Sequence, residues 1–291
     1  MSRQDRADAL DAELTTRPLP PAAVSVLGEW LAGTGAPYAR GTGAHAVSFA
    51  PERWSSVPAW PASAAPAAGP LSRARVTDAV REAVRDGRWA EALAVPYAWG
   101  HGGTGYGPHR LRKILAAPHA PRVLAEAASV LGDDGPVEAY RVLRGAVKGL
   151  GPAFFTKFLY FVDQAADAPA APRASATPRA SATPRASATP RASATPRASA
   201  APRALVLDRK VARVVRAHAT RVGREARLPG AAGTAAWIWS DGGWTEHRYA
   251  VYLRWVAHAS GQLASAGIGW PEDSPDLLEL ALFSDIWDPA R

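Results

Sequence analysis

The chain contains no cysteine, and this absence excludes several kinds of site at once. Without thiol groups its 291 residues can form no disulfide, no cysteine-ligated zinc site and no iron–sulfur cluster. Long apolar runs are missing as well, since none approaches the ~18 consecutive residues that a membrane-spanning helix needs. The charged residues 1–14 carry no apolar signal-peptide core. We therefore expect a soluble, cytoplasmic protein without a membrane partner.

Lysine is also scarce. The chain has only four lysines against 30 arginines (34 − 4). Arginine can bind anions at a surface, but it does not lose its proton and so cannot act as an amine nucleophile. Any such chemistry falls to the four lysines, which are Lys113, Lys148, Lys157 and Lys210.

The positive charge of the chain is concentrated in one segment. The formal net charge is +8 at pH 7, but residues 168–203 hold six arginines and no acidic residue. Removing these six charges leaves +2 (8 − 6) for the rest of the chain. A body with so little net charge can bind a nucleic acid only through a local basic patch.

The same segment is an internal repeat. The unit Pro-Arg-Ala-Ser-Ala-Thr recurs every six residues between 172 and 203. A six-residue period with proline in every copy matches no packed helix or strand, so the sequence predicts a disordered linker. Its arginines could contact phosphates non-specifically, or the repeat could be an expansion tolerated in a surface loop. The predicted divisions are an N-terminal region of helices and loops, 1–70, a helical lobe, 71–167, the linker, 168–203, and a C-terminal helical part, 204–291.

Elsewhere the apolar spacing is that of helices, so the predicted fold class is mainly α. The alternation typical of a strand occurs only in Ala44–Phe49, and the Gly-rich stretch Pro96–Pro108 predicts a turn. The aromatic residues predicted to lie in the core are Trp244, Tyr249, Tyr252 and Trp255. Helices are expected over Ala9–Thr15, Ala22–Ala32, Ser72–Asp86, Ala90–Ala94, Pro108–Leu115, Pro121–Leu131, Val137–Lys148, Asp208–Val222, Trp244–Leu263 and Asp276–Phe283, and a loop over Trp237–Gly243.

The strongest local signal is the segment Val147–Phe155, which reads Val-Lys-Gly-Leu-Gly-Pro-Ala-Phe-Phe. A helix ends in a turn that contains Gly149 and Gly151, and a second helix starts at Pro152, where the missing N–H costs nothing. The glycines let a phosphate approach the backbone, and the unpaired N–H groups of the helix start favour its charge. This pattern predicts a helix-hairpin-helix motif that grips a DNA backbone without reading its sequence. The alternative is an ordinary turn between helices closed by a glycine.

Two candidate catalytic residues flank the repeat. Lys157 lies on the second hairpin helix among aromatic and aliphatic residues, and burial there favours the uncharged amine, the form that acts as a nucleophile. Asp208 follows the apolar run 204–207 and precedes a helix, which predicts an N-cap. The alternatives are a lysine that extends its ammonium group to the surface and an aspartate that only caps its helix.

With these residues the chain resembles the helix-hairpin-helix DNA glycosylases, especially the 8-oxoguanine DNA glycosylase branch. In that family an aspartate at a helix start stabilises the sugar cation as the base leaves. In the lyase members a lysine of the hairpin helix forms a Schiff base with the sugar. The resemblance implies these roles for Asp208 and Lys157. The two lie 51 residues apart (208 − 157), and excising the 36 residues 168–203 leaves 15 (51 − 36), a sensible connection.

The position of the lysine departs from the family pattern. The family's lysine lies two positions after the second hairpin glycine, where this chain has Ala153. Lys157 follows four residues later, which is one helical turn or about 6 Å along the axis. Because side chains on a helix lean toward its N-terminus, Lys157 can recover part of that distance.

A second resemblance to this family lies in the segment Leu278–Asp285. The 8-oxoguanine glycosylases end their catalytic domain with a similar helix and a Leu-Phe-Ser turn, whose Phe stacks on the extruded base while a Gln four residues earlier reads the base edge. Phe283 matches the Phe, and Glu279 occupies the Gln position on the same helix face. A carboxylate only accepts hydrogen bonds, which leaves open another modified base, such as one in phage DNA. The alternative is an amphipathic helix with Phe283 in the core.

The resemblance implies a two-lobed helical fold that flips a damaged or modified base out of double-stranded DNA and excises it. In that fold the N-terminal half forms one lobe, the hairpin and the Asp208 helix form the other, and the C-terminal helices wall the base pocket. We expect a nucleoid-associated monomer that uses no cofactor and no metal. Residues expected to hold phosphates are Lys148, Gly149, Gly151 and Lys210, and those expected in the base pocket are Glu279, Phe283 and Trp99. Candidates to fill the gap left by the base are Trp99, Tyr106 and His109, with Arg110 on a phosphate.

Two other functions remain open at this stage. A non-catalytic helix-hairpin-helix module would bind DNA without releasing a base. A helical protein–protein adaptor, in which the hairpin is incidental, would show no salt-sensitive DNA binding.

Overall fold

A computed structural model describes residues 1–61, 69–102, 105–167 and 202–290. The prediction of a mainly α protein is confirmed. Within these residues twelve α-helices are accompanied by three short 3₁₀-helices and one two-stranded sheet. The predicted disordered repeat lies outside the described residues except for its last two positions. None of the described helices is long and apolar enough to span a membrane.

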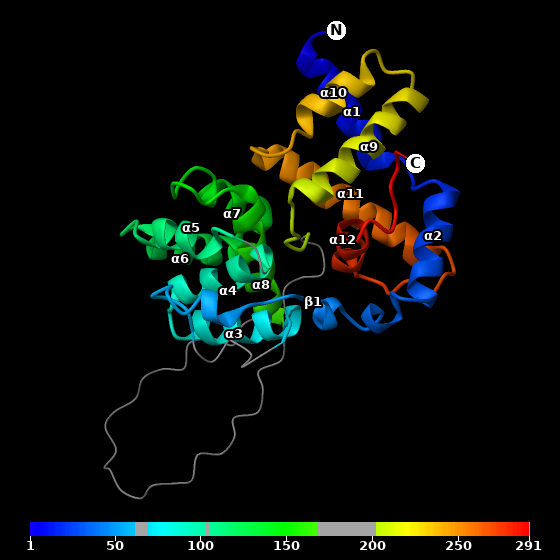
Figure 1. Ribbon diagram of the computed structural model, residues 1–291. Coiled ribbons are helices and arrows are strands. Elements are labelled where there is room, and N and C mark those ends of the chain that lie inside the picture. The colour runs from blue at the N-terminus through cyan, green and yellow to red at the C-terminus, as the bar shows by residue number, and fades with distance from the viewer. Residues whose placement is uncertain (62–68, 103–104, 168–201, 291) are drawn as a thin grey trace, which may run out of the picture.

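Six consecutive helices form the first of two lobes, which we call the hairpin lobe (Figure 1). They are α3 (Arg73–Arg85), α4 (Trp89–His101), α5 (Gly107–Leu115), α6 (Ala120–Asp133), α7 (Pro136–Leu143) and α8 (Pro152–Asp167). Helix α8 is central because it packs against α3, α4, α6 and α7. Nearly all of its residues from 155 to 165 are buried, as expected of a helix that is surrounded by others.

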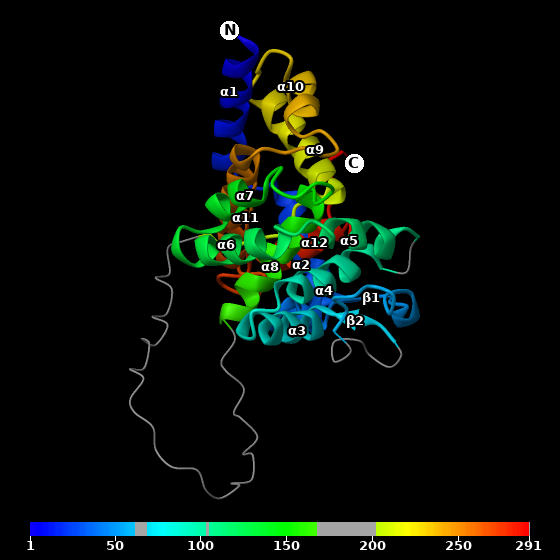
Figure 2. The ribbon, with the colours of Figure 1, turned by 90° about the vertical axis from the view of Figure 1, so that its left-hand side faces the viewer.

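Helices from both ends of the chain form the second lobe, which we call the terminal lobe. They are α1 (Arg3–Thr16), α2 (Pro21–Ala32), α9 (Arg209–Glu225), α10 (Ala231–Ile238), α11 (Glu246–Ser265) and α12 (Pro275–Phe283). Helix α1 packs against α9, α10 and α11, so the start of the chain lies beside its last third (Figures 1 and 2). The helices of the N-terminal region therefore help to build the same lobe as the helix that follows Asp208.

This division into lobes differs from the predicted one. Helix α9 packs against α1, α10 and α12, whereas both hairpin helices, α7 and α8, belong to the hairpin lobe. The hairpin and Asp208 therefore come from different lobes and not, as predicted, from the same one. The sequence pattern did not reveal this, because one packing partner of α9 lies at the opposite end of the chain.

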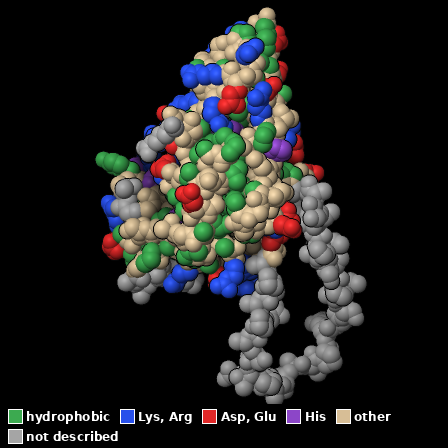
Figure 3. All heavy atoms as spheres, turned by 90° about the vertical axis from the view of Figure 1, so that its right-hand side faces the viewer, with side chains coloured by type: hydrophobic (Ala, Val, Ile, Leu, Met, Phe, Trp, Pro, Cys, Tyr) green, Lys and Arg blue, Asp and Glu red, His purple; other side chains and the backbone are tan. Residues whose placement is uncertain are grey.

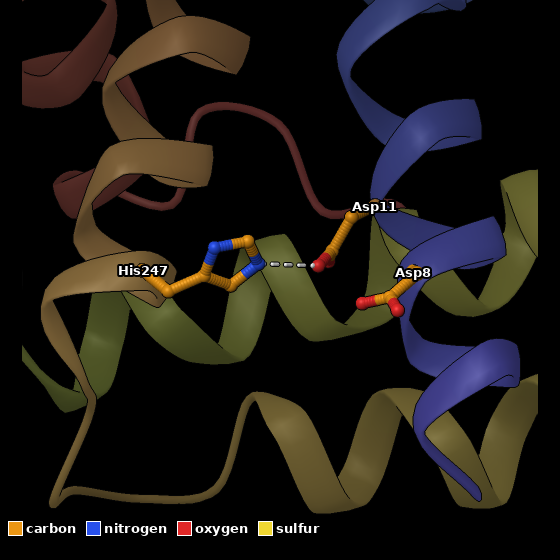
Figure 4. Close-up of side chains that lie close together, drawn as sticks. All are labelled: Asp8, Asp11 and His247. Atoms are coloured by element: carbon orange, nitrogen blue, oxygen red, sulfur yellow. Dashed lines mark hydrogen bonds and ion pairs between the residues drawn. The ribbon is translucent and has the colours of Figure 1, made fainter.

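A buried ion pair anchors α1 on α11. The two terminal nitrogens of the Arg248 guanidinium donate to the two carboxylate oxygens of Asp11, and both side chains are buried. His247 Nε2 lies 3.1 Å from the same carboxylate (Figure 4). A bidentate pair of this kind is strong and directional, so it fixes how α1 lies on α11.

The sheet is small and connects the two lobes. Strand β1 (Ala46–Val47) pairs antiparallel with β2 (Leu71–Ser72), directly before α3. The predicted strand over 44–49 contains β1, but only two of its residues pair. The 3₁₀-helices nearby are η1 (Ala36–Tyr38), η2 (Thr42–Ala44) and η3 (Pro51–Arg53).

Tertiary packing overrides local signals in α4 and α10. Helix α4 was predicted to end at Ala94, before a turn, but it continues through Pro96 to His101. A proline inside a helix removes one backbone hydrogen bond, yet all residues from 92 to 99 are buried, and burial of this apolar run offsets the loss. Helix α10 contains Trp237, which was predicted to lie in a loop.

Helix α7 ends at Leu143, five residues before the predicted end. Gly145 follows with φ +76, a conformation that commonly ends a helix. The hairpin turn is therefore longer than predicted. The four aromatic residues predicted for the core are confirmed there, since each is at most 3% exposed.

The fold holds the two ends of the repeat segment together. Arg203 pairs with Asp167, the last residue of α8, at 2.6 Å. The backbone N–H of Ala204 donates to the Asp163 carboxylate at 2.9 Å. Both points at which the repeat joins the fold are thus fixed by contacts with α8.

Replacing residues 168–201 with four Gly/Ser residues should therefore leave the fold intact. Shortening a loop lowers the entropy lost when it closes, by about 0.6 kcal/mol for each halving of its length. We expect a melting temperature, followed by circular dichroism, that equals or slightly exceeds that of the full chain. A scrambled repeat of the original length is the control and should change nothing. A clearly lower melting temperature in the shortened protein would show that the repeat contributes to the folded state.

His218 is a fully buried histidine of α9. Its ring packs against Trp255 and Trp287, with centroid distances of 5.4 and 5.2 Å. Arg221 donates to its Nδ1 at 3.0 Å. Burial, assisted by the charge of Arg221, lowers the pKa of His218 to about 3. The ring is therefore neutral in the folded protein at pH 7.

This histidine should make the folded state sensitive to acid. Its pKa is about 3 when folded and about 6.5 in an unfolded chain, so the unfolded state binds one more proton between these values. The free energy of unfolding should fall as the pH drops from 6.5 toward 3, by at most about 1.4 kcal/mol per pH unit. Urea denaturation at pH 7, 6 and 5 should show a flatter dependence for His218→Phe and an unchanged one for the exposed control His258→Phe. Equal slopes in wild type and His218→Phe would rule His218 out as the cause.

Candidate active site

The turn between α7 and α8 has the geometry that its glycines predict. Gly149 has φ +88, and the Leu150 N–H donates to the Val147 carbonyl at 3.1 Å, which closes a β-turn. Leu150 is buried and anchors the turn, whereas Lys148 and Gly149 are exposed. Helix α8 begins at the predicted Pro152. The turn therefore presents its exposed backbone next to a helix N-terminus, a favourable place for an anion.

Two neighbouring residues of the hairpin lobe contact this turn. His119 Nε2 donates to the Ala146 carbonyl at 3.0 Å. Ile114 of α5 lies close to Gly149, since a Cβ added there would be 3.5 Å from its side chain. The exposed residues of the same helix include Arg110, Arg112 and Lys113. Basic side chains thus lie on the helix that packs beside the hairpin.

The opposite side of the molecule shows no such concentration of charge. Helices α5, α6 and α7 lie on the left in Figure 1, and Figure 3 shows the molecule from the right. On that face the Lys and Arg side chains are scattered toward the top and the bottom, and the centre is mostly hydrophobic or uncharged (Figure 3). The hairpin side is therefore the better candidate for a phosphate-binding surface.

Lys157 projects from α8 back toward the start of that helix. Its Nζ donates to the Ala153 carbonyl at 2.8 Å, and its side chain is 6% exposed. The amine therefore lies beside position 153, where the similar glycosylases carry their lysine. The side chain thus recovers the helical turn that separates the two positions, in the direction in which helical side chains lean.

Asp208 meets this lysine from the terminal lobe. It is the N-cap of α9, as predicted: its Oδ1 accepts from the backbone N–H groups of Lys210 and Val211, at 3.0 and 3.2 Å. Its other oxygen, Oδ2, lies 3.3 Å from Nζ of Lys157. One carboxylate oxygen is therefore fixed by the helix start, and the other is directed at the amine.

The aliphatic part of Lys157 lies against Gly100 in α4. A Cβ at position 100 would come within 2.6 Å of Cδ and 2.8 Å of Cε of the lysine. These distances are too short for any side chain, so only glycine leaves room for Lys157 in this orientation. Phe154 contributes a further contact, with its ring centre 5.8 Å from Nζ.

Trp99, which precedes Gly100 in α4, begins a row of aromatic contacts. The ring of Trp99 lies edge-on to that of His45, with centroids 5.7 Å apart. His45 in turn lies edge-on to Phe283 at 6.2 Å. Residues from α4, from the loop before β1 and from the end of α12 therefore meet here.

Lys210 connects Phe283 with Asp208. Its Nζ lies 4.9 Å from the centre of the Phe283 ring, and the residue stands two positions after Asp208. We call the whole set the site ring, which comprises Lys157, Gly100, Trp99, His45, Phe283, Lys210 and Asp208. The ring contains five predicted site residues and draws on both lobes.

Glu279, which was predicted to read a base edge, pairs instead with a buried arginine. Its Oε2 accepts from Nη2 of Arg73 at 2.9 Å, and the two side chains are 1% and 2% exposed. Arg73 also donates to the Tyr160 hydroxyl at 3.1 Å. Burial raises the pKa of Glu279 to about 7, against the opposing effect of Arg73. Glu279 is thus paired within the protein and almost fully buried.

Other predicted residues lie outside the site ring. Tyr106 is 77% exposed and stands at the N-cap of α5. His109 and Arg110 are exposed on the first turns of that helix. Lys148, Gly149 and Gly151 belong to the hairpin. These residues line the basic side of the molecule and not the surroundings of Lys157.

Within the described residues one group could offer three ligands to a metal ion. Ligand atoms of Asp8, Asp11 and His247 lie within 4.8 Å of one another, between α1 and α11 (Figure 4). Both oxygens of Asp11 already accept from Arg248, and the positive charge of Arg248 disfavours a cation at the same carboxylate. The group shares no residue with the site ring, and we assign no metal to it.

A helix-hairpin-helix turn, a lysine on its second helix and an aspartate at the start of the next described helix, all in a two-lobed helical fold, define the class of the helix-hairpin-helix DNA glycosylases. The chain belongs to the family described as "Putative 8-oxoguanine DNA glycosylase OGG-like protein", whose sequence model matches residues 40–176 and 192–283. The match contains the hairpin and the whole site ring, and its gap lies inside the repeat. At the level of the family, the protein is a DNA glycosylase with a DNA substrate. No curated protein and no solved structure matches the chain.

The sequence analysis missed three residues that shape the site, namely Gly100, Arg73 and His45. Gly100 stands in a Gly-rich stretch that predicted a turn. Arg73 is one of many arginines, and its partner Glu279 lies 206 residues away. The Gly-rich composition around position 100 was the only local signal for any of them.

Gly100→Ala should destabilise the protein through Lys157. In the wild type the added methyl group must displace the lysine chain, and such overpacking costs about 1–3 kcal/mol. In a Lys157→Ala background the obstacle is absent, and the same change should gain about 0.5–1 kcal/mol, the usual preference of a helix for alanine. Urea denaturation of the four proteins measures both effects.

Gly261→Ala in α11 is the matched control, because a Cβ at this helical position meets nothing within 4 Å. It should be stabilising in both backgrounds. If Gly100→Ala had the same effect with and without Lys157, the steric role of Gly100 would be refuted.

Proposed function

We propose that the protein extrudes a damaged or modified base from double-stranded DNA and breaks its N-glycosidic bond, with Lys157 as the nucleophile. One observation carries this proposal: Nζ of Lys157 lies 3.3 Å from Oδ2 of Asp208, next to a hairpin suited to phosphate. A carboxylate beside an amine can accept its proton, and an adjacent base of this kind activates a nucleophile. The family membership supports the same reaction class.

The reaction can be written with these two groups. Asp208 accepts a proton from the Lys157 ammonium group, and the free amine attacks C1′ of the sugar. The bond from C1′ to the base breaks, and its electron pair leaves with the base, which takes up the proton that Asp208 accepted. The carboxylate of Asp208 stabilises the positive charge that develops on the sugar. The attached nitrogen then gives up a proton to the ring oxygen, the C1′–O4′ bond breaks with its electron pair on that oxygen, and the C1′–N bond becomes a Schiff base, from which the DNA strand can be cleaved by elimination.

The hairpin and the neighbouring lysines would hold the DNA during this reaction. The backbone around Gly149 and Gly151 and the exposed Lys148 would contact phosphates. Lys210 is about one-third exposed and pairs with Asp285 at 2.8 Å, so it can exchange this partner for a phosphate. These contacts would set the position of the strand without reading its sequence.

The proposed recognition of the base involves the site ring and not position 279. Phe283 is half-buried at the end of α12 and offers a ring face on which a base can stack. Because Glu279 is occupied by Arg73, its difference from the family's Gln is no argument for a phage-modified base. We therefore propose an oxidised purine as the substrate class, in line with the family description.

Borohydride trapping tests the proposal. Wild type, Lys157→Gln and Asp208→Asn would be incubated with duplexes that each carry one modified base, 8-oxoguanine first, or an abasic site. We expect a covalent adduct with the wild type, no adduct with Lys157→Gln, and a base-release rate at least about 100-fold lower with Asp208→Asn. Lys148→Gln is the control: it should bind DNA more weakly but still form the adduct at saturating protein.

The remaining outcomes separate the alternatives. Base release without an adduct, lost only in Asp208→Asn, would mean that water replaces Lys157 as the nucleophile. Salt-sensitive binding to every duplex without release from any of them would refute the proposal and favour a non-catalytic DNA-binding module.

A further inference from the structure

His45 has a fixed place in the site ring. It follows η2 and precedes β1, and its backbone N–H donates to the Thr42 carbonyl at 3.0 Å. Its own carbonyl accepts from the Arg73 N–H at 2.8 Å. The ring lies edge-on between Trp99 and Phe283. Both the backbone and the ring of His45 are thus held by neighbours on several elements.

Two adjacent ring nitrogens at this place are buried without a hydrogen-bond partner among the described residues: Nδ1 of His45 and Nε1 of Trp99. An unpaired buried polar atom costs about 1–3 kcal/mol, so such atoms mark positions where a ligand or water supplies the missing bond. Trp239 and Trp255 also have buried unpaired nitrogens, but they lie against Arg248 and His218, outside the site ring. Only the nitrogens of His45 and Trp99 belong to side chains of the ring around Lys157 and Asp208.

The imidazole of His45 is uncharged at neutral pH. Burial, and secondarily the charge of Arg73, lower its pKa to about 4. A neutral imidazole carries one donor and one acceptor nitrogen. It therefore suits an uncharged ligand edge on which donors and acceptors lie side by side.

Oxidised purines have an edge of this kind. Guanine presents a bare N7 and a C8–H group, whereas 8-oxoguanine presents an N7–H donor beside a C8 carbonyl acceptor. Both His45 and Phe283 are half-buried, so part of each side chain is accessible to a base that enters beside Phe283. Their ring centroids lie 6.2 Å apart, so one base can contact both rings.

We propose that His45 hydrogen-bonds the edge of the extruded base and selects an oxidised purine, with Trp99 Nε1 as a second donor. This inference rests on the proposed function and assigns to His45 the reading of the base that the sequence suggested for Glu279. Glu279 then acts through Arg73, which ties α12 and its Phe283 to the backbone of His45.

The test compares a reaction that needs the base with a binding event that does not. Single-turnover release of 8-oxoguanine would be measured for wild type, His45→Phe, His45→Asn and His45→Gln. The affinity of each protein for a duplex with a tetrahydrofuran abasic analogue would be measured alongside. We expect His45→Phe to release the base about 10- to 100-fold more slowly, as the loss of one or two hydrogen bonds implies, with an affinity for the abasic analogue within about twofold.

The amide variants and a distant histidine serve as controls. His45→Asn or His45→Gln, which keep a donor and an acceptor, should recover part of the rate that His45→Phe loses. His258→Phe, an exposed position of α11 outside the site ring and the hairpin, should change neither readout.

Each failure has a distinct meaning. Unchanged release by His45→Phe would refute the inference and leave the proposed function standing. Loss of release together with loss of abasic-site binding would make His45 a structural residue and also refute it. A wild type that releases some other base but not 8-oxoguanine would overturn the substrate class, and a wild type that releases no base would overturn both proposals.

Discussion

The buried ion pair of Arg73 and Glu279 is the interaction on which the arrangement of the two lobes depends. Arg73 begins α3 in the hairpin lobe, and Glu279 lies on α12 in the terminal lobe. The same guanidinium donates to Tyr160 on α8, so three helices converge on one charge. Removing one partner of such a pair leaves an uncompensated buried charge and costs about 3–5 kcal/mol. The hairpin helices and Asp208 lie on opposite sides of this junction, so the ion pair helps to hold Lys157 and Asp208 together.

Residues 204–207 make the second connection between the lobes. Tyr249 and Tyr252 of α11 donate to the carbonyls of Leu205 and Val206, each at 2.9 Å, and the Leu207 N–H donates to Thr156 of α8. This extended segment is buried, and side chains satisfy the backbone groups that a strand would otherwise pair. These contacts place Asp208 beside Lys157 and do not involve the preceding repeat. The chemistry is thereby separated from the length of the repeat.

Much of the fold could be predicted from local patterns, and the exceptions have a common cause. Capping chemistry predicts that helices start at Pro152 and Asp208. Periodicity predicts that Trp255 and its neighbours lie in the core. The continuation of α4 through Pro96 could not be predicted in this way, because buried contacts with α3 and α8 outweigh the local effect of a proline. The division into lobes was also missed, since the packing of α1 against α9 joins opposite ends of the chain.

The sequence by itself determined the turn at Gly149, the cap at Asp208 and the choice of Lys157 as the candidate amine, because each depends on backbone conformation or on chemistry within a few residues. Only the tertiary structure decided that Asp208 comes within 3.3 Å of Lys157, that Gly100 leaves room for the lysine, and that His45 has an unpaired nitrogen in the site ring while Glu279 pairs with Arg73. These features arise from residues far apart in the chain. The energies that bring such residues together are sums over many packing contacts, and no local sequence pattern encodes them.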